Sequence, residues 1–219
     1  MIHLNLEQWS NRPLQILCLG CHSDDIEIGC GGTILRLAAQ YPECSFHWVV
    51  FSANGVREAE AHRGAAFFAG SAQLRGPLLK NVRDGFMPYL GVEVKEFFEE
   101  LKQSISPAVI FTHHRHDAHQ DHRLIAELTW NTFRDHFILE YEIPKFDGDL
   151  GQPNFFVPLE AECYQKKVQC IMDAFPSQHS KRWFQQDTFL ALMRLRGMEC
   201  NAPSGYAEAF YCRKAVLLP

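Results

Sequence analysis

Residues 14–40 read LQILCLGCHSDDIEIGCGGTILRLAAQ, and this stretch decides the fold. It begins with a short apolar run, continues through a polar turn at residues 22–25, and ends with apolar residues at helical spacing. Short apolar runs that lead into helical patterns are typical of buried parallel strands and their crossover helices. The stretch therefore predicts the first strand–helix unit of an α/β fold, with a charged turn at the carboxyl end of the strand.

The same alternation continues as far as residue 143. The expected strands are residues 14–21, 44–52, 73–79, 107–112 and 137–143, and the expected helices are residues 29–40, 57–69, 92–104 and 122–133. Such alternation predicts an α/β, Rossmann-like three-layer sandwich around a mainly parallel sheet. The expected strand order is about 3-2-1-4-5, which makes strands one and four neighbours.

The last third of the chain follows a different pattern. Residues 145–158 are rich in Gly, Pro and Asp and predict a long loop, which serves either as a substrate lid or as a plain connection. Two further helices are expected at 162–174 and 183–196, and a last strand at 207–217. A chain of 219 residues fits a single domain over 1–219, with a core at about 14–143 and a carboxyl-terminal extension at about 144–219.

Composition excludes several functional classes. The net charge of −5 and the lack of a basic stripe argue against nucleic acid as the main partner. No apolar stretch approaches the length of a membrane span, and residues 1–15 lack the basic and apolar regions of a signal peptide. Several of the eight cysteines lie inside apolar runs, as reduced thiols do in cytosolic proteins, so we expect a cytoplasmic protein. The oligomeric state stays open, and a homo-oligomer is compatible with the sequence.

Cys18 and Cys21 have C-x-x-C spacing but belong to the first predicted strand. Residues three apart on a strand point to opposite faces of the sheet. We therefore expect the two thiols to be structural and not a zinc-binding or redox pair.

Two polar clusters follow strands one and four: HSDD at residues 22–25 and HQDH at residues 119–122. In an open α/β sheet, ligands bind beyond the carboxyl ends of the strands, at the point where the strand order reverses. Because strands one and four are neighbours in the expected order, the two clusters should form one site.

The residue types in the two clusters predict a catalytic metal centre. His22 and Asp25 are close enough along a turn to face one point, and His122 is the natural third ligand. Two histidines and one carboxylate leave a coordination position open for water, as in hydrolytic zinc enzymes. Asp24 cannot easily share the face of its neighbours and is left free to accept a proton. Zinc (Zn2+) is the expected cofactor, and iron or cobalt (Fe2+ or Co2+) suits the same ligands.

Two further residues of the second cluster have expected roles. His119 lies about one helical turn before His122, where it would stabilise a developing oxyanion or protonate a leaving amine. Asp121 would fix the tautomer of a neighbouring histidine. Three more histidines stand between residues 113 and 116, so a polar loop is the alternative explanation for this density of histidines.

The glycines at residues 29–32 read GCGG and lack the third glycine of the dinucleotide-binding pattern G-x-G-x-x-G. We interpret them as allowing the helix to pack closely beneath the metal loop, with a phosphate-binding nest as the alternative. Arg57 and Glu60 begin the second helix, near the same edge of the sheet. They either bind a polar substrate or form an i,i+3 ion pair on a solvated face.

The segment CHSDDIEIGCGG at residues 21–32 resembles the A-H-P-D-D-x-E-x-x-x-G-G motif of the PIG-L (LmbE-like) deacetylases. HQDHR at residues 119–123 resembles the H-x-D-H motif of the same family, and the resemblance covers about residues 14–143. Cys21 and Ser23 stand where the family usually has alanine and proline. From Pro144 onward nothing matches one substrate, and in the family this region shapes the pocket.

The resemblance implies a zinc-dependent N-deacetylase and a role for each matching residue. It implies zinc ligands at His22, Asp25 and His122, a general base at Asp24, an oxyanion-stabilising histidine at His119, a supporting aspartate at Asp121, and substrate contacts at Arg57 and Glu60. The implied reaction is hydrolysis of the N-acetyl group of an N-acetylglucosamine-type sugar or sugar conjugate, by a zinc-activated water from which Asp24 takes a proton.

Two other functions stay open at this point. A metal-dependent phosphoesterase also uses histidine and aspartate clusters, although two-metal sites usually need more carboxylates. A non-catalytic protein of the same fold could bind sugars or nucleotides. The free carboxylate of Asp24 argues against the non-catalytic function, because structural zinc is closed by four protein ligands.

Overall fold

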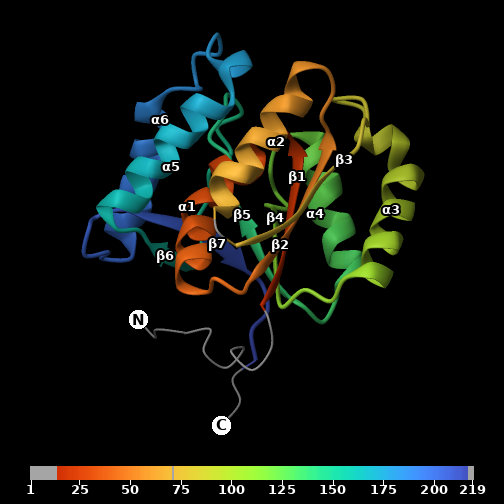
Figure 1. Ribbon diagram of the computed structural model, residues 1–219, viewed down its shortest axis with the longest axis horizontal. Helices are drawn as coiled ribbons and strands as arrows, with labels where there is room; N and C mark the ends of the chain where they lie inside the picture. Colours follow the sequence, from red (N-terminus) through yellow and green to blue (C-terminus); the bar gives the residue numbers. More distant parts are fainter. Residues whose placement is uncertain (1–13, 71, 217–219) are drawn as a thin grey trace.

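The computed structural model describes residues 14–70 and 72–216, and within them seven strands form one sheet (Figure 1). The strands are β1 (Gln15–His22), β2 (Ser45–Ser52), β3 (Gln73–Leu79), β4 (Val109–His113), β5 (Phe137–Tyr141), β6 (Phe155–Pro158) and β7 (Ala207–Cys212). They lie in the order β3-β2-β1-β4-β5-β7-β6, and the first five are parallel. The predicted order 3-2-1-4-5 is confirmed. The expectation about a signal peptide rests largely on residues 1–13, which lie outside the described residues.

Helices cover both faces of the sheet, as a three-layer sandwich requires (Figure 1). The longer helices are α1 (Asp25–Gln40), α2 (Val56–Ala69), α3 (Gly91–Ser104), α4 (Gln120–Thr132), α5 (Ala161–Ala174) and α6 (Gln186–Glu199), with short 3₁₀ turns η2 (Met87–Leu90) and η3 (Pro176–Gln178). One apolar cluster includes residues of α1, α2, α5 and α6, and a second lies on the α3–α4 face. No helix among the described residues has both the length and the apolar character that crossing a membrane requires.

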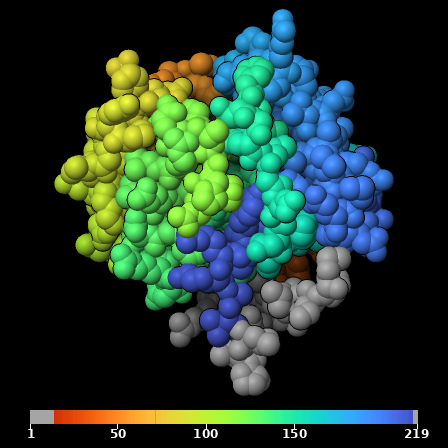
Figure 2. Space-filling model, turned by 180° about the vertical axis from the view of Figure 1, so that it is seen from behind, coloured from red at the N-terminus to blue at the C-terminus, as the bar shows by residue number. Residues whose placement is uncertain are grey.

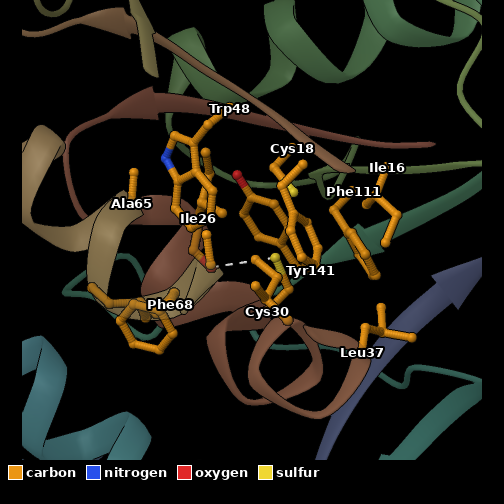
Figure 3. Close-up of a cluster of buried hydrophobic side chains, with 14 of the residues drawn as sticks. Ile16, Cys18, Ile26, Cys30, Leu37, Trp48, Ala65, Phe68, Phe111 and Tyr141 are labelled. Atoms are coloured by element: carbon orange, nitrogen blue, oxygen red, sulfur yellow. Dashed lines mark hydrogen bonds between the residues drawn. The ribbon is translucent and has the colours of Figure 1, made fainter. Parts of the chain in front are cut away.

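The two apolar clusters separate Cys18 from Cys21. Cys18 packs in the first cluster with Cys30 and Tyr141, as Figure 3 shows, whereas Cys21 packs in the second. Both thiols are free and buried. The predicted placement on opposite faces of the sheet is therefore confirmed.

The carboxyl-terminal segment contains a strand, β6, that the sequence pattern did not predict. Residues 145–158 were expected to form a loop throughout, but β6 occupies the last four of them and pairs antiparallel with β7. Phe155, Phe156 and Val157 are half-buried there, so β6 is a short edge strand. The strand was not predicted because its apolar run is short and directly follows residues that are rich in Gly and Pro. β7 also pairs antiparallel with β5, so the extension continues the same sheet.

Helix α1 begins at Asp25, four residues before the predicted start, and is kinked at Cys30 (φ −141°, ψ 15°). A kink leaves backbone N–H groups without partners on the far side of the break. The carboxylate of Glu208 on β7 fills this gap, because it accepts the N–H groups of Gly32 and Thr33, each at 2.7 Å. Lys167 on α5 pairs with the same carboxylate at 2.6 Å, and both side chains are buried. The backbone amides that a phosphate would use in a nest therefore bind Glu208.

The glycines of α1 allow close packing, as the sequence analysis predicted. A Cβ atom added at Gly29 would collide with the ring of Tyr141 on β5. One added at Gly31 would collide with the ring of Phe68 on α2. Only glycine lets this part of α1 approach both the sheet and the next helix so closely.

Candidate metal centre

The two polar clusters lie at one edge of the sheet because β1 and β4 are parallel neighbours. His22 is the last residue of β1, and Asp25 is the first residue of α1. His122 is the third residue of α4, which follows β4. The carboxyl ends of the two strands therefore bring together side chains that are about a hundred residues apart in the sequence.

Three candidate ligand atoms form a nearly equilateral triangle. His22 Nδ1 lies 3.4 Å from Asp25 Oδ2 and 3.3 Å from His122 Nε2, and the side from His122 Nε2 to Asp25 Oδ2 is 3.6 Å. A tetrahedral zinc ion about 2.0–2.1 Å from nitrogen and oxygen ligands separates them by about 3.3 Å. The triangle thus has the dimensions that such an ion requires.

The outer nitrogen of each histidine is held by a carboxylate. His122 Nδ1 lies 2.9 Å from Asp117 Oδ2, and His22 Nε2 lies 3.0 Å from Asp84 Oδ1. A metal-binding imidazole usually donates its second N–H to such a partner, which fixes the tautomer and leaves the first nitrogen free for the ion. Neither aspartate was predicted to belong to the site. Asp84 follows β3, far in sequence from both clusters, and Asp117 was part of the histidine-rich loop.

Asp84→Ala is expected to weaken metal binding about tenfold, because outer partners of this kind are worth about 10–100-fold in affinity. The side chain of Asp84 is 72% exposed, so the stability of the fold should change little. Competition with a chelator measures the affinity, and Asp135→Ala, at a side chain that is 92% exposed, is the control. An unchanged affinity in Asp84→Ala would show that His22 does not need this carboxylate.

Asp24 lies between two members of the triangle but has different partners. It precedes α1 with a positive φ of 150°, which is uncommon for a residue other than glycine and typical of constrained functional sites. Its Oδ1 accepts a hydrogen bond from Arg57 Nη2 at 2.7 Å. Burial raises the pKa of Asp24 to about 6, against the lowering effect of Arg57. A carboxylate with such a pKa can accept a proton near neutral pH.

Arg57 is half-buried and Glu60 is buried. The alternative prediction, an i,i+3 ion pair on a solvated face, would have left both side chains exposed. Arg57 Nε lies 3.8 Å from Glu60 Oε2, and the side chain of Glu60 is 1% exposed. Glu60 accepts hydrogen bonds from the backbone N–H and the hydroxyl of Ser177, at 2.8 and 2.6 Å. Arg57 also donates to the carbonyl of Ser23. The pair therefore links the loop before α1 to η3 of the extension, and a substrate contact by either residue stays a prediction.

His119 is the N-cap residue of α4, and its Nδ1 accepts the N–H of Asp121 at 3.3 Å. A neutral ring in this position carries its proton on Nε2, where it can donate. Burial lowers the pKa of His119, and so do the neighbouring His122 and His22. His119 is therefore prepared to be a neutral hydrogen-bond donor beside the triangle, with ring centroids 4.6 Å from His122 and 5.1 Å from His22.

Asp121 contacts a loop more closely than it contacts a histidine. Its carboxylate accepts the N–H groups of Gly85 at 2.7 Å and Met87 at 3.2 Å. Its Oδ2 lies 3.7 Å from His22 Nε2, beyond ordinary hydrogen-bond distance. Asp121 thus holds the segment that carries Asp84. Its role in fixing the tautomer of a histidine stays a prediction.

Cys21 and His113 are buried at the centre, and neither was predicted to belong to it. His113 was counted among loop histidines, but it ends β4, and its Nε2 lies 3.2 Å from Asp25 Oδ2. Its ring stacks on that of His122, with centroids 3.9 Å apart. Ligand atoms of Cys21, Asp25, His113 and His122 all lie within 4.8 Å of one another. β4 ends one residue later than predicted, so His113 is the last residue of the strand and not part of the following loop. His113 was not predicted because the end of the strand was placed at residue 112.

The fold and the cluster define the chain as a doubly wound α/β protein with a candidate metal centre at its switch point. The chain belongs to the PIG-L family, because the family model described as GlcNAc-PI de-N-acetylase matches residues 17–133. The resemblance inferred from the two motifs is confirmed.

Solved structures share the fold at low sequence identity. The conserved protein TT1542 from Thermus thermophilus is 20% identical, with a TM-score of 0.71 over 94% of this chain and 97% of that chain. N,N'-diacetylchitobiose deacetylase from Pyrococcus horikoshii is 18% identical, with a TM-score of 0.68 over 94% and 86%. GalB, the 4-carboxy-2-hydroxymuconate hydratase from Pseudomonas putida, is 15% identical, with a TM-score of 0.71 over 94% and 98%. One fold thus carries a deacetylase and a hydratase, so the reaction has to be argued from the site.

Proposed function

We propose that this protein is a metal-dependent hydrolase that removes the N-acetyl group from an acetylated amino sugar or a conjugate of it, with zinc as the metal. The observation that carries the proposal is the triangle of His22, Asp25 and His122 beside a carboxylate, Asp24, that is bound to Arg57. The PIG-L family match and the deacetylase of similar fold support the same reaction.

The donor set suits zinc and an open site. Two imidazoles and one carboxylate are a known catalytic zinc set that leaves a fourth position for water. When bound, the ion would polarise the amide carbonyl and make the attacking water more acidic.

The residues around the triangle supply the proton transfers and charge stabilisation. Asp24 accepts the proton of the attacking water, and its bond to Arg57 fixes the direction of the carboxylate. His119 donates its Nε2 proton toward the developing oxyanion. This tautomer is fixed before the reaction, because Nδ1 already accepts the N–H of Asp121. The departing amine then takes up the proton that Asp24 accepted, so the products are acetate and a free amino sugar.

A metal analysis with an acetate-release screen tests the proposal. His122→Ala should lower the bound zinc per chain and abolish acetate release, because it removes one corner of the triangle. His116→Ala is the matched control, since His116 is exposed in the same loop region and outside the triangle. The screen covers N-acetylated sugars and their conjugates, with and without a chelator.

Three outcomes would contradict the proposal. Full zinc content in His122→Ala would remove this residue from the ligand set. Phosphate release from nitrophenyl phosphate without deacetylation would favour a phosphoesterase. Binding of an acetylated sugar without acetate release, by the zinc-loaded chain, would favour a non-catalytic protein.

A further inference from the structure

Asp117, the partner of His122, is itself held from several sides. Its Oδ2 lies 2.9 Å from His122 Nδ1, while its Oδ1 accepts the N–H of His119 at 2.8 Å. Lys145 Nζ lies 3.0 Å from the same Oδ1. Asp117 is 3% exposed, so these contacts take the place of water. The orientation of this carboxylate toward His122 therefore depends on the two groups that bind its Oδ1, the N–H of His119 and the ammonium of Lys145.

Lys145 belongs to the segment after β5, beyond the residues that match the family model. Its side chain is 9% exposed and also contacts Asp149 Oδ2 at 2.6 Å. Asp149 in turn accepts the N–H of Ala118 at 2.6 Å. Lys145 and Asp149 thus both contact the turn that leads into α4. Figure 2 shows the chain after β5 (teal) crossing the surface between the green and the blue elements.

We propose that Lys145 is a positioning residue for the metal centre: it holds Asp117 against His122 and so links the segment after β5 to the affinity for the metal. The inference rests on the proposed function, because it takes the triangle to be the metal site. Lys145 contacts Asp117 directly, at 3.0 Å, and its side chain is 9% exposed, which makes this path from the extension to His122 a short one.

The sign of the effect separates positioning from simple charge repulsion. A lysine near a bound cation repels it, so Coulomb interaction alone predicts tighter metal binding when the lysine is removed. Positioning predicts the opposite, because Asp117 loses the contact that fixes its orientation. Lys145→Met in the chain of 219 residues is expected to weaken zinc binding about tenfold, the lower end of the range for outer partners.

Asp149→Asn is the matched control. It removes the charge at the far side of Lys145 but keeps a carbonyl oxygen that can accept the N–H of Ala118, and it leaves the contact between Lys145 and Asp117 in place. Its zinc affinity should stay within about twofold of wild type, below the effect of losing an outer partner. If Asp149→Asn weakens zinc as much as Lys145→Met does, the packing of the segment and not Lys145 itself is responsible, and the inference is overturned.

A double-mutant cycle with Asp117→Asn shows whether Lys145 acts through Asp117. The dissociation constant for zinc is measured by chelator competition in the wild type, both single variants and the double variant. Lys145→Met should have an effect of less than about twofold in the Asp117→Asn background. An equal effect in both backgrounds, an unchanged affinity, or tighter binding overturns the inference alone. A wild-type chain that binds no zinc overturns the proposed metal site as well.

Discussion

Asp24→Ala is expected to lower the rate of deacetylation at least about a hundredfold while the chain keeps its zinc, because general-base catalysis contributes about 10²–10⁴-fold. Asp24 is adjacent to Asp25, a predicted ligand, but its carboxylate bonds to Arg57 and lies outside the triangle of candidate ligand atoms. Removing it should therefore affect the proton transfer and spare the metal.

Two measurements on the same preparation test this prediction. Acetate release under saturating substrate gives the turnover, and elemental analysis gives zinc per chain. Asp135→Ala, at a side chain that is 92% exposed, is the control for the loss of a carboxylate. A fully active Asp24→Ala would exclude Asp24 as the base, and a variant without zinc would show that Asp24 is a ligand.

Glu208→Ala is expected to have the largest effect on stability, about 3–5 kcal/mol of unfolding free energy, because it leaves the charge of Lys167 buried without its partner. The same change leaves the N–H groups of Gly32 and Thr33 at the kink of α1 without an acceptor. The hydroxyl of Thr33, which donates to the same carboxylate at 2.6 Å, also loses its partner.

Urea unfolding of the metal-free protein measures this effect without interference from metal binding. The double variant Glu208→Gln with Lys167→Met is the informative comparison, because it removes both charges and keeps an acceptor for the amides of α1. It should be more stable than Glu208→Ala. If Glu208→Ala unfolds within about 0.5 kcal/mol of the wild type, a change typical of surface sites, the carboxylate does not support the kink.

The sheet core could be predicted because its information is local. Apolar runs of strand length alternate with helical patterns over residues 14–143, and this alternation leads directly to a parallel sheet with the order that the structure has. Both polar clusters could be found in the same way, since each lies where the chain passes from a strand to the next helix. A parallel sheet then brings the two strand ends to one edge without further information.

The supporting residues could not be predicted because their partners are distant in the sequence. Asp84 reaches His22 from a loop 62 residues away, and Glu208 reaches Thr33 across 175 residues. Neither position has a neighbouring pattern that marks its role. β6 was missed for a related reason, since a four-residue edge strand depends on the β7 backbone beside it and has no period of its own.

The link between Glu60 and Ser177 bears on how the chain can be divided. Glu60 lies within the residues that match the family model, while Ser177 lies in the extension, and the carboxylate of Glu60 is buried where η3 covers it. A fragment ending near residue 143 would expose this acid and would also leave α1 without Glu208. We therefore expect that the part of the molecule that matches the family does not fold stably when the chain is trimmed to the family boundary, because these buried contacts are lost.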